Sequence, residues 1–141
     1  MRAFGACGRG RLRPCDCLRC AVLASVKEYL RTKLAGFEHE VFAILFLDAR
    51  HRLIEYVEMF RGTIDGAEVH PREVVKEALQ HNAAAVIFSH NHPSGNPEPS
   101  AANWALTQRL KKALALIEVC TLDHIIVAGD QTMAFAERGW L

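Results

Sequence analysis

The sequence lacks several features that would place it in a specialised class of protein. Its 141 residues carry 17 Lys and Arg against 16 Asp and Glu, which gives a formal net charge of +1. This balance offers no broad positive surface for nucleic acid or for an anionic membrane. Apolar runs such as 41–47 fall far short of the roughly 20 residues that a membrane helix needs. We therefore expect a globular cytoplasmic protein of about one domain, without membrane association.

Cysteine is present but unevenly distributed. Four of the five cysteines lie in the first 20 residues, and Cys120 stands apart. An odd number of cysteines, without a convincing signal peptide, argues against a disulfide framework. The N-terminal Cys-x-Cys-x-x-Cys cluster could bind zinc, but it lacks the paired spacing of common zinc sites. We interpret residues 1–20, which are rich in Gly, Arg and Cys, as a disordered arm whose arginines could contact phosphate.

From residue 21 the sequence has the regular spacing of a layered domain. Apolar residues repeat every four positions in 21–35, which predicts a helix that Gly36 ends. The apolar runs 41–48 and 83–89 have the length of strands covered on both faces. Further strands are expected at 52–60, 123–128 and 132–136, and further helices after His70 and Ser100. The predicted apolar faces of these two helices are Val74, Val75, Ala78 and Leu79, and Leu106, Leu110, Leu114 and Ile117. This alternation predicts an α/β fold.

The segment HNHPSGNPEP, residues 90–99, interrupts this pattern and carries the candidate chemistry. Its three prolines and one glycine predict a loop directly after a buried strand. His90 and His92 are two positions apart, so in an extended chain both imidazoles point to one side and can bind one metal ion. Asn103 shares the inward face of the next helix, so all three side chains can converge. Three ligands beside an open position are typical of a catalytic zinc site.

An aspartate would be a stronger ligand than the asparagine at position 103. A carboxylate supplies negative charge to Zn²⁺, whereas the Asn103 amide offers only a neutral carbonyl oxygen. We expect this loss of charge to weaken metal binding by at least the roughly 10–100-fold known for disturbed supporting partners of metal ligands.

Several blocks of the sequence resemble one known family. HNHPSGNPEPS, followed by a helix, is very similar to the JAMM motif in the JAB/MPN domain of RadC-like bacterial proteins. The similarity includes HEVFAILFLDARHRLI, MFRGTIDGAEVHPREVVKEAL, AAAVIFSHNHPSG, LDHIIVAG and FAERGW, and it covers residues 21–141. The resemblance implies a JAB/MPN, cytidine-deaminase-like layered fold, with a mixed β-sheet flanked by helices.

The resemblance also implies a role for individual residues. His90 and His92 match the zinc-binding histidines, and the aspartate ligand of the family falls at Asn103. Glu40 matches the glutamate that accepts a proton from zinc-activated water and delivers it to the leaving amine. Ser100 matches the serine that helps to stabilise the oxyanion, and it also suits a helix N-cap. The implied activity is zinc-dependent hydrolysis of a peptide or isopeptide bond in a peptide or protein substrate.

Two departures from the family keep other functions open. Asn103 favours a catalytically impaired MPN scaffold that binds a protein partner, whereas retention of the other motif residues favours the hydrolase. Full RadC-like proteins carry a helix-hairpin-helix region ahead of this domain, and residues 1–20 are too short for it. A DNA-repair-associated module is therefore the weaker alternative.

The neighbouring residues Asp123 and His124 on a predicted strand allow three interpretations. They are a structural polar pair, a pair that supports a metal ligand, or a second metal site. The first is the most common role of such a pair.

Overall fold

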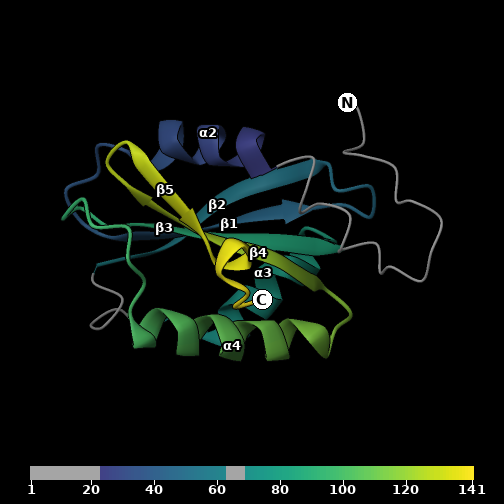
Figure 1. Ribbon diagram of the computed structural model, residues 1–141. Helices are drawn as coiled ribbons and strands as arrows, with labels where there is room; N and C mark the ends of the chain where they lie inside the picture. Colours follow the sequence, from purple (N-terminus) through teal and green to yellow (C-terminus); the bar gives the residue numbers. More distant parts are fainter. Residues whose placement is uncertain (1–22, 63–68) are drawn as a thin grey trace.

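The computed structural model describes residues 23–62 and 69–141. The predicted arm 1–20 lies outside the described residues, so its boundary with the domain stays a prediction. Figure 1 shows three layers, with helix α2 above a β-sheet and helices α3 and α4 below it. The helices are α2 (Leu23–Leu34), α3 (Pro71–Gln80) and α4 (Ala101–Ala115).

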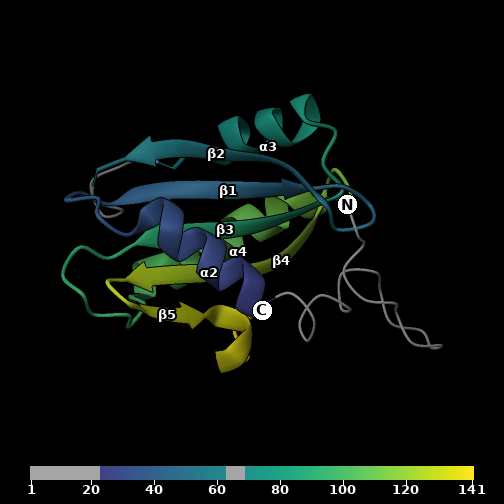
Figure 2. The ribbon, with the colours of Figure 1, turned by 90° about the horizontal axis from the view of Figure 1, so that it is seen from above.

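Five strands form one mixed sheet in the order β2-β1-β3-β4-β5. They are β1 (Val41–Leu47), β2 (Leu53–Arg61), β3 (Ala85–Asn91), β4 (Cys120–Ala128) and β5 (Gln131–Ala134). β3 and β4 run parallel, and the other neighbours run antiparallel, as the arrows in Figure 2 show. A parallel pair needs a crossover, and α4 provides it. The predicted α/β fold, a mixed sheet flanked by helices, is confirmed.

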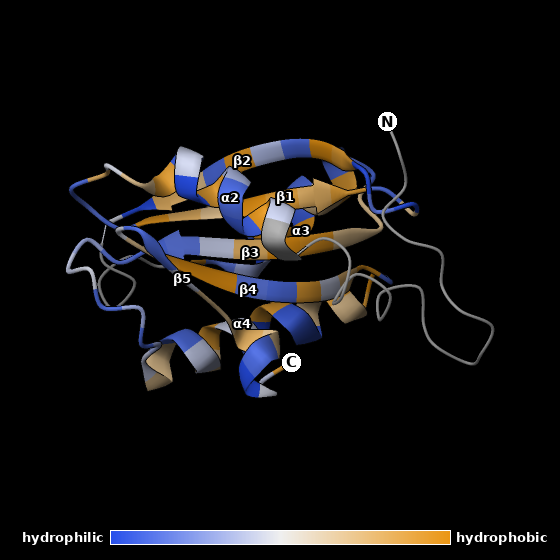
Figure 3. Cartoon of the chain, turned by 45° about the horizontal axis from the view of Figure 1, so that its top comes forward, coloured by the Kyte–Doolittle hydropathy of each residue, from blue (hydrophilic) through white to orange (hydrophobic). Residues whose placement is uncertain are grey.

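The alternation of side chains along the strands divides the core into two halves. Val41 and Leu45 of β1 share one apolar cluster with Leu34 of α2. Phe42 points to the other face and shares a second cluster with Leu110 of α4, because successive residues of a strand face opposite ways. Every residue of β1 and β3 is buried. Helices on both faces therefore explain the continuous apolar runs, and Figure 3 shows β3 turning hydrophilic only towards its arrowhead.

The prediction that β3 ends at residue 89 is wrong. The strand continues through His90 and Asn91, which are both buried, instead of entering the loop at residue 90. Parallel pairing with β4 continues to Asn91 and Val127, and the His92 N–H donates to the Val127 carbonyl at 2.8 Å. This pairing overrides the polar character of the segment. β5 ends two residues earlier than expected, because Phe135–Arg138 forms a 3-10 helix, η2.

The helices follow the predicted pattern with two corrections. Gly36 follows α2 with a φ of +103°, a conformation that favours glycine. In α3, Val74 and Ala78 are buried, but Leu79 is 61% exposed because it lies one residue off their face. Ile117 lies beyond the end of α4, yet it still packs against the same core. Among the described residues, no helix is long and apolar enough to cross a membrane.

Candidate functional site

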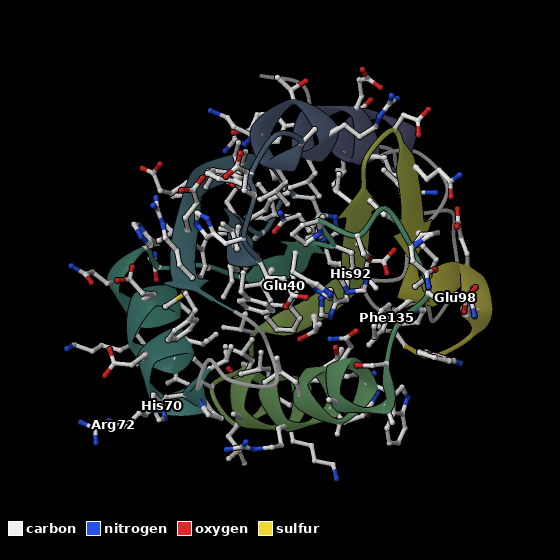
Figure 4. All side chains as sticks on the ribbon, turned by 90° about the vertical axis from the view of Figure 1, so that its left-hand side faces the viewer. Glu40, His70, Arg72, His92, Glu98 and Phe135 are labelled. Atoms are coloured by element: carbon white, nitrogen blue, oxygen red, sulfur yellow. The ribbon has the colours of Figure 1, made fainter. Side chains whose placement is uncertain are left out.

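The predicted histidines and glutamate lie at the same end of the sheet. His90 is the penultimate residue of β3, His92 follows that strand, and Glu40 immediately precedes β1. The antiparallel register pairs Phe42 with His90. Glu40 precedes Phe42 by two residues, so alternation directs both side chains to the sheet face that α3 and α4 cover, the face of His90. Figure 4 looks onto this end of the sheet and shows Glu40 and His92 close together in the view.

A buried relay of hydrogen bonds sets the tautomer of His90. The Thr107 hydroxyl donates to the backbone carbonyl of Asn103 at 2.8 Å. Its oxygen therefore accepts, at 2.5 Å, from the Nδ1–H of His124. The His124 Nε2 then carries a lone pair and accepts from the His90 Nδ1–H at 2.7 Å. This assignment, inferred from the donor and acceptor chemistry, leaves a lone pair on His90 Nε2 that faces His92.

The loop after β3 orients the second ring. The Nδ1 atom of His92 lies 2.8 Å from the backbone oxygen of Asn96, which can only accept, so Nδ1 carries the hydrogen. The Nε2 atoms of His90 and His92 are 2.8 Å apart. In neutral rings, two lone pairs would face one another across this distance. A cation, either a proton or a metal ion, relieves that repulsion, so the two rings fit a shared cation.

Aromatic rings hold His124 in an apolar environment. Phe135 stacks on its imidazole, with ring centroids 4.5 Å apart and planes inclined by 20°. Phe42 and Phe88 form T-shaped contacts with the same imidazole, with ring centroids 5.8 and 5.9 Å apart. These contacts restrict the ring and exclude water from it, so its two nitrogens depend on the relay for hydrogen bonds.

Burial keeps the two inner imidazoles of the site neutral. It lowers the pKa of His90 well below its usual range, and the neighbouring His124 and His92 rings lower that pKa further. Burial, with a smaller contribution from His92, lowers the pKa of His124 to about 3. At neutral pH, His90 and His124 therefore carry no charge, and the neutral form is the one in which an imidazole binds a metal.

Ser100 and Asn103 form a capping box at the start of α4. The Asn103 Oδ1 accepts from the Ser100 N–H at 2.9 Å, and the Ser100 Oγ accepts from the Asn103 N–H at 3.1 Å. The predicted N-cap and the predicted inward position of Asn103, which is 3% exposed, are both present. The cap does not use the hydrogen of the Ser100 hydroxyl. The role of that hydroxyl at an oxyanion stays a prediction.

The third ligand is the weak point of the candidate metal site. Within residues 23–62 and 69–141, no three His, Cys, Asp or Glu side chains are grouped so that they could hold a metal ion. Asn103 brings a neutral oxygen that already accepts one hydrogen bond. The side chains present thus fit a cation through His90 and His92, with at most a weak third donor.

Sequence reasoning missed Thr107 and treated Asp123 and His124 as a pair. The structure separates the two neighbours, because adjacent strand residues face opposite ways. Asp123 accepts from the backbone N–H groups of His124 and Ala136, at 2.8 and 3.0 Å, so it ties β4 to η2. Burial raises the pKa of the Asp123 carboxyl, although the two hydrogen bonds act to lower it. Asp123 is therefore structural, whereas His124 supports His90.

Comparison of the amino-acid sequence with known proteins identifies the family of this chain. The profile of the RadC-like JAB domain matches residues 21–140. The chain belongs to the RadC-like JAB domain family. This RadC-like chain is 67% identical over 114 residues to a UPF0758 protein of Vibrio cholerae serotype O1, covering 81% of the chain and 72% of the relative.

Two further relatives are longer than this RadC-like chain. A UPF0758 protein of Nitrosococcus oceani is 60% identical over 117 residues, covering 83% of the chain and 52% of the relative. A UPF0758 protein of Cellvibrio japonicus is 59% identical over 116 residues, covering 82% of the chain and 52% of the relative. The chain thus spans about half the length of these two relatives. The family gives a JAMM-like domain, and the names of the relatives state no activity.

The relay predicts different effects for two substitutions of Thr107. Thr107→Val removes the hydroxyl and leaves the buried His124 Nδ1–H without its partner, which costs about 1–3 kcal/mol of unfolding free energy. Thr107→Ser keeps the hydroxyl and is expected to cost less. Urea denaturation of the chelator-treated protein measures both. Equal losses in the two variants would mean that the hydroxyl is not part of a relay.

The neutral state of His124 predicts a dependence of stability on pH. Above about pH 6.5 the ring is neutral in both the folded and the unfolded chain and adds no dependence. Below that pH, His124 binds a proton in the unfolded chain, whereas in the folded chain it stays neutral down to about pH 3. Unfolding free energy therefore falls on acidification, by up to about 1.4 kcal/mol per pH unit.

Denaturation curves between pH 7.5 and pH 5 test this dependence. In His124→Asn the slope should be smaller by the contribution of one proton. A wild-type slope in His124→Asn contradicts the assignment.

Proposed function

We propose that this chain is a zinc-dependent hydrolase of peptide or isopeptide bonds whose metal site is weakened by Asn103. The observation that carries the proposal is the distance of 2.8 Å between the Nε2 atoms of His90 and His92. The tautomers inferred above direct a lone pair of each atom towards the other ring. Metal-binding histidines usually donate their other ring N–H to a fixed acceptor. His90 does so to His124, and His92 to a loop carbonyl.

Each residue of the site has a defined task in this reaction. Zinc, when bound, polarises a carbonyl group and lowers the pKa of water towards neutrality. His90 and His92 hold the ion through Nε2, and Asn103 contributes a weak oxygen donor. Glu40 takes a proton from the attacking water and delivers it to the leaving nitrogen. Ser100 donates its hydroxyl hydrogen to the developing oxyanion while its oxygen keeps the helix cap.

A pocket beside His92 supports the substrate side of the proposal. It has a volume of about 430 Å³ and lies between the segment after α2 and the ends of β3 and β4. Phe37 and Pro93 contribute apolar walls, and Glu38 contributes a carboxylate. Concave sites with apolar walls and few polar groups are typical of substrate sites. Of the five site residues, His92 alone lines this pocket, so we infer that the pocket receives a part of the substrate that extends past His92 towards α2.

A catalytically impaired scaffold is the second candidate function. It is favoured by Asn103, whose oxygen already accepts from the Ser100 N–H and carries no charge for a metal ion. In this case the same end of the sheet binds a protein partner without turnover. The DNA-repair role and the cytoplasmic location stay predictions from the sequence.

Zinc stoichiometry after dialysis against a mild chelator tests the metal site. We expect the natural chain to retain zinc, and Asn103→Asp to bind it about 10–100-fold more tightly. His92→Ala should retain none, and His70→Ala, at an exposed position, should behave as the natural chain does. Zinc in Asn103→Asp alone would favour the scaffold. Its absence from both chains would contradict the metal site.

Glu40→Gln separates the hydrolase from the scaffold. Removal of the proton acceptor should lower hydrolysis of fluorogenic peptide and isopeptide libraries by about 10²–10⁴-fold. Zinc content should stay unchanged, because Glu40 is not a ligand in this proposal. Undiminished hydrolysis in Glu40→Gln, or loss of zinc with it, would refute the role given to Glu40.

A further inference from the structure

Asn91 lies between the two histidines of the site, but its side chain faces the other side of the sheet. Alternation along the chain directs His90 and His92 towards the α4 face, so it directs Asn91 towards the α2 face. The residue is only 3% exposed. A buried amide is costly unless its hydrogen bonds are satisfied, so its partners indicate what it does there.

The side-chain amide of Asn91 binds the peptide groups on both sides of Glu40. Its Oδ1 accepts from the Val41 N–H at 2.6 Å. Its Nδ2 donates to the carbonyl of His39 at 2.9 Å. One donor and one acceptor on the same side chain thus replace the two backbone contacts that a neighbouring strand would make.

This replacement occurs where the ladder between β1 and β3 has ended. The last backbone pair of these strands is Phe42 with His90, two residues short of Glu40. On its other side, the Glu40 carbonyl accepts from the Gly62 N–H at 2.8 Å. Asn91 and Gly62 therefore fix the backbone at Glu40 from opposite directions.

We propose that Asn91 is a positioning residue that holds Glu40 on the sheet face of His90 for proton transfer. The inference rests on the proposed hydrolase function. Fixing the peptide groups on both sides of Glu40 fixes the direction of its Cα–Cβ bond, and thereby the face on which its carboxylate lies. A general base must come within hydrogen-bond reach of its proton, and a misplacement of about 1 Å can cost about 10²-fold in rate.

Asn91→Ala tests the proposal, with Ser89→Ala as the matched control. Ser89 is a buried residue on the same strand face, two positions earlier, and its Oγ has no hydrogen-bond partner within the described part of the chain. Both substitutions remove a small buried polar side chain from β3. Only Asn91→Ala removes the contacts with the chain around Glu40. Each is made in the natural chain and in Asn103→Asp.

Three measurements on the full chain follow the position of Glu40. Amide hydrogen exchange at Gly62 reports whether the backbone at Glu40 is held. The carbon-13 resonance of the Glu40 carboxyl, assigned by its loss in Glu40→Gln, reports whether zinc is sensed there. Zinc affinity reports whether the histidines are intact.

We expect Asn91→Ala to accelerate Gly62 exchange by about tenfold, as fits the loss of about one net hydrogen bond. The zinc-dependent shift of the Glu40 carboxyl resonance should disappear. Zinc affinity should change by less than about threefold, below the effect of disturbing a partner of a metal ligand. Ser89→Ala should leave all three measurements as in the parent chain.

A purely structural Asn91 gives a different result. In that case, Asn91→Ala lowers stability, but the Glu40 carboxyl still responds to zinc, and the proposal is overturned. If zinc binds to neither the natural chain nor Asn103→Asp, the proposed function fails by itself. Amide exchange at Gly62 in Asn91→Ala then decides the inference. Faster exchange supports the role of Asn91 in fixing the backbone at Glu40, and unchanged exchange overturns it.

Discussion

The buried hydrogen bond between His90 and His124 determines what this site can do. A buried ring N–H needs an acceptor, and His124 can accept only because Thr107 takes the hydrogen of its other nitrogen. The Thr107 hydroxyl is in turn committed to a carbonyl within α4. The direction of the His90 lone pair therefore depends on β3, β4 and the crossover helix being packed together. The parallel pair supplies both imidazoles, and its crossover supplies the hydroxyl.

Asn103 makes the hydrogen bond of the helix cap, but unlike an aspartate it carries no negative charge. Its oxygen satisfies the Ser100 N–H, as the side chain at the third position of a capping box does. An aspartate could accept the same bond and would also gain from the helix dipole at this end. Helix stability therefore does not explain the asparagine. Its consequence falls on the cation between His90 and His92, which must be held without a carboxylate.

The sequence predicted elements that depend on local patterns, and it missed contacts that depend on register. The apolar runs predicted β1 and β3 because both faces of these strands are covered, and helical spacing placed Asn103 on the buried face of α4. The polar segment around His90 concealed the end of β3, since pairing with β4 extends the strand. The contacts of Thr107 and His124 follow from a non-local parallel register, which no spacing along the chain reveals. The predicted roles of Glu40 and Ser100 came from family resemblance and stay predictions.

The most direct test of the relay is nitrogen-15 NMR of the histidine rings, recorded without metal and during zinc addition. The relay places the hydrogen of His90 on Nδ1 and that of His124 on Nδ1. Zinc should then shift the Nε2 resonances of His90 and His92 together. A hydrogen on the Nε2 of His90 that persists when zinc is added would contradict it, because the lone pair would then face the core and the cation site would not exist.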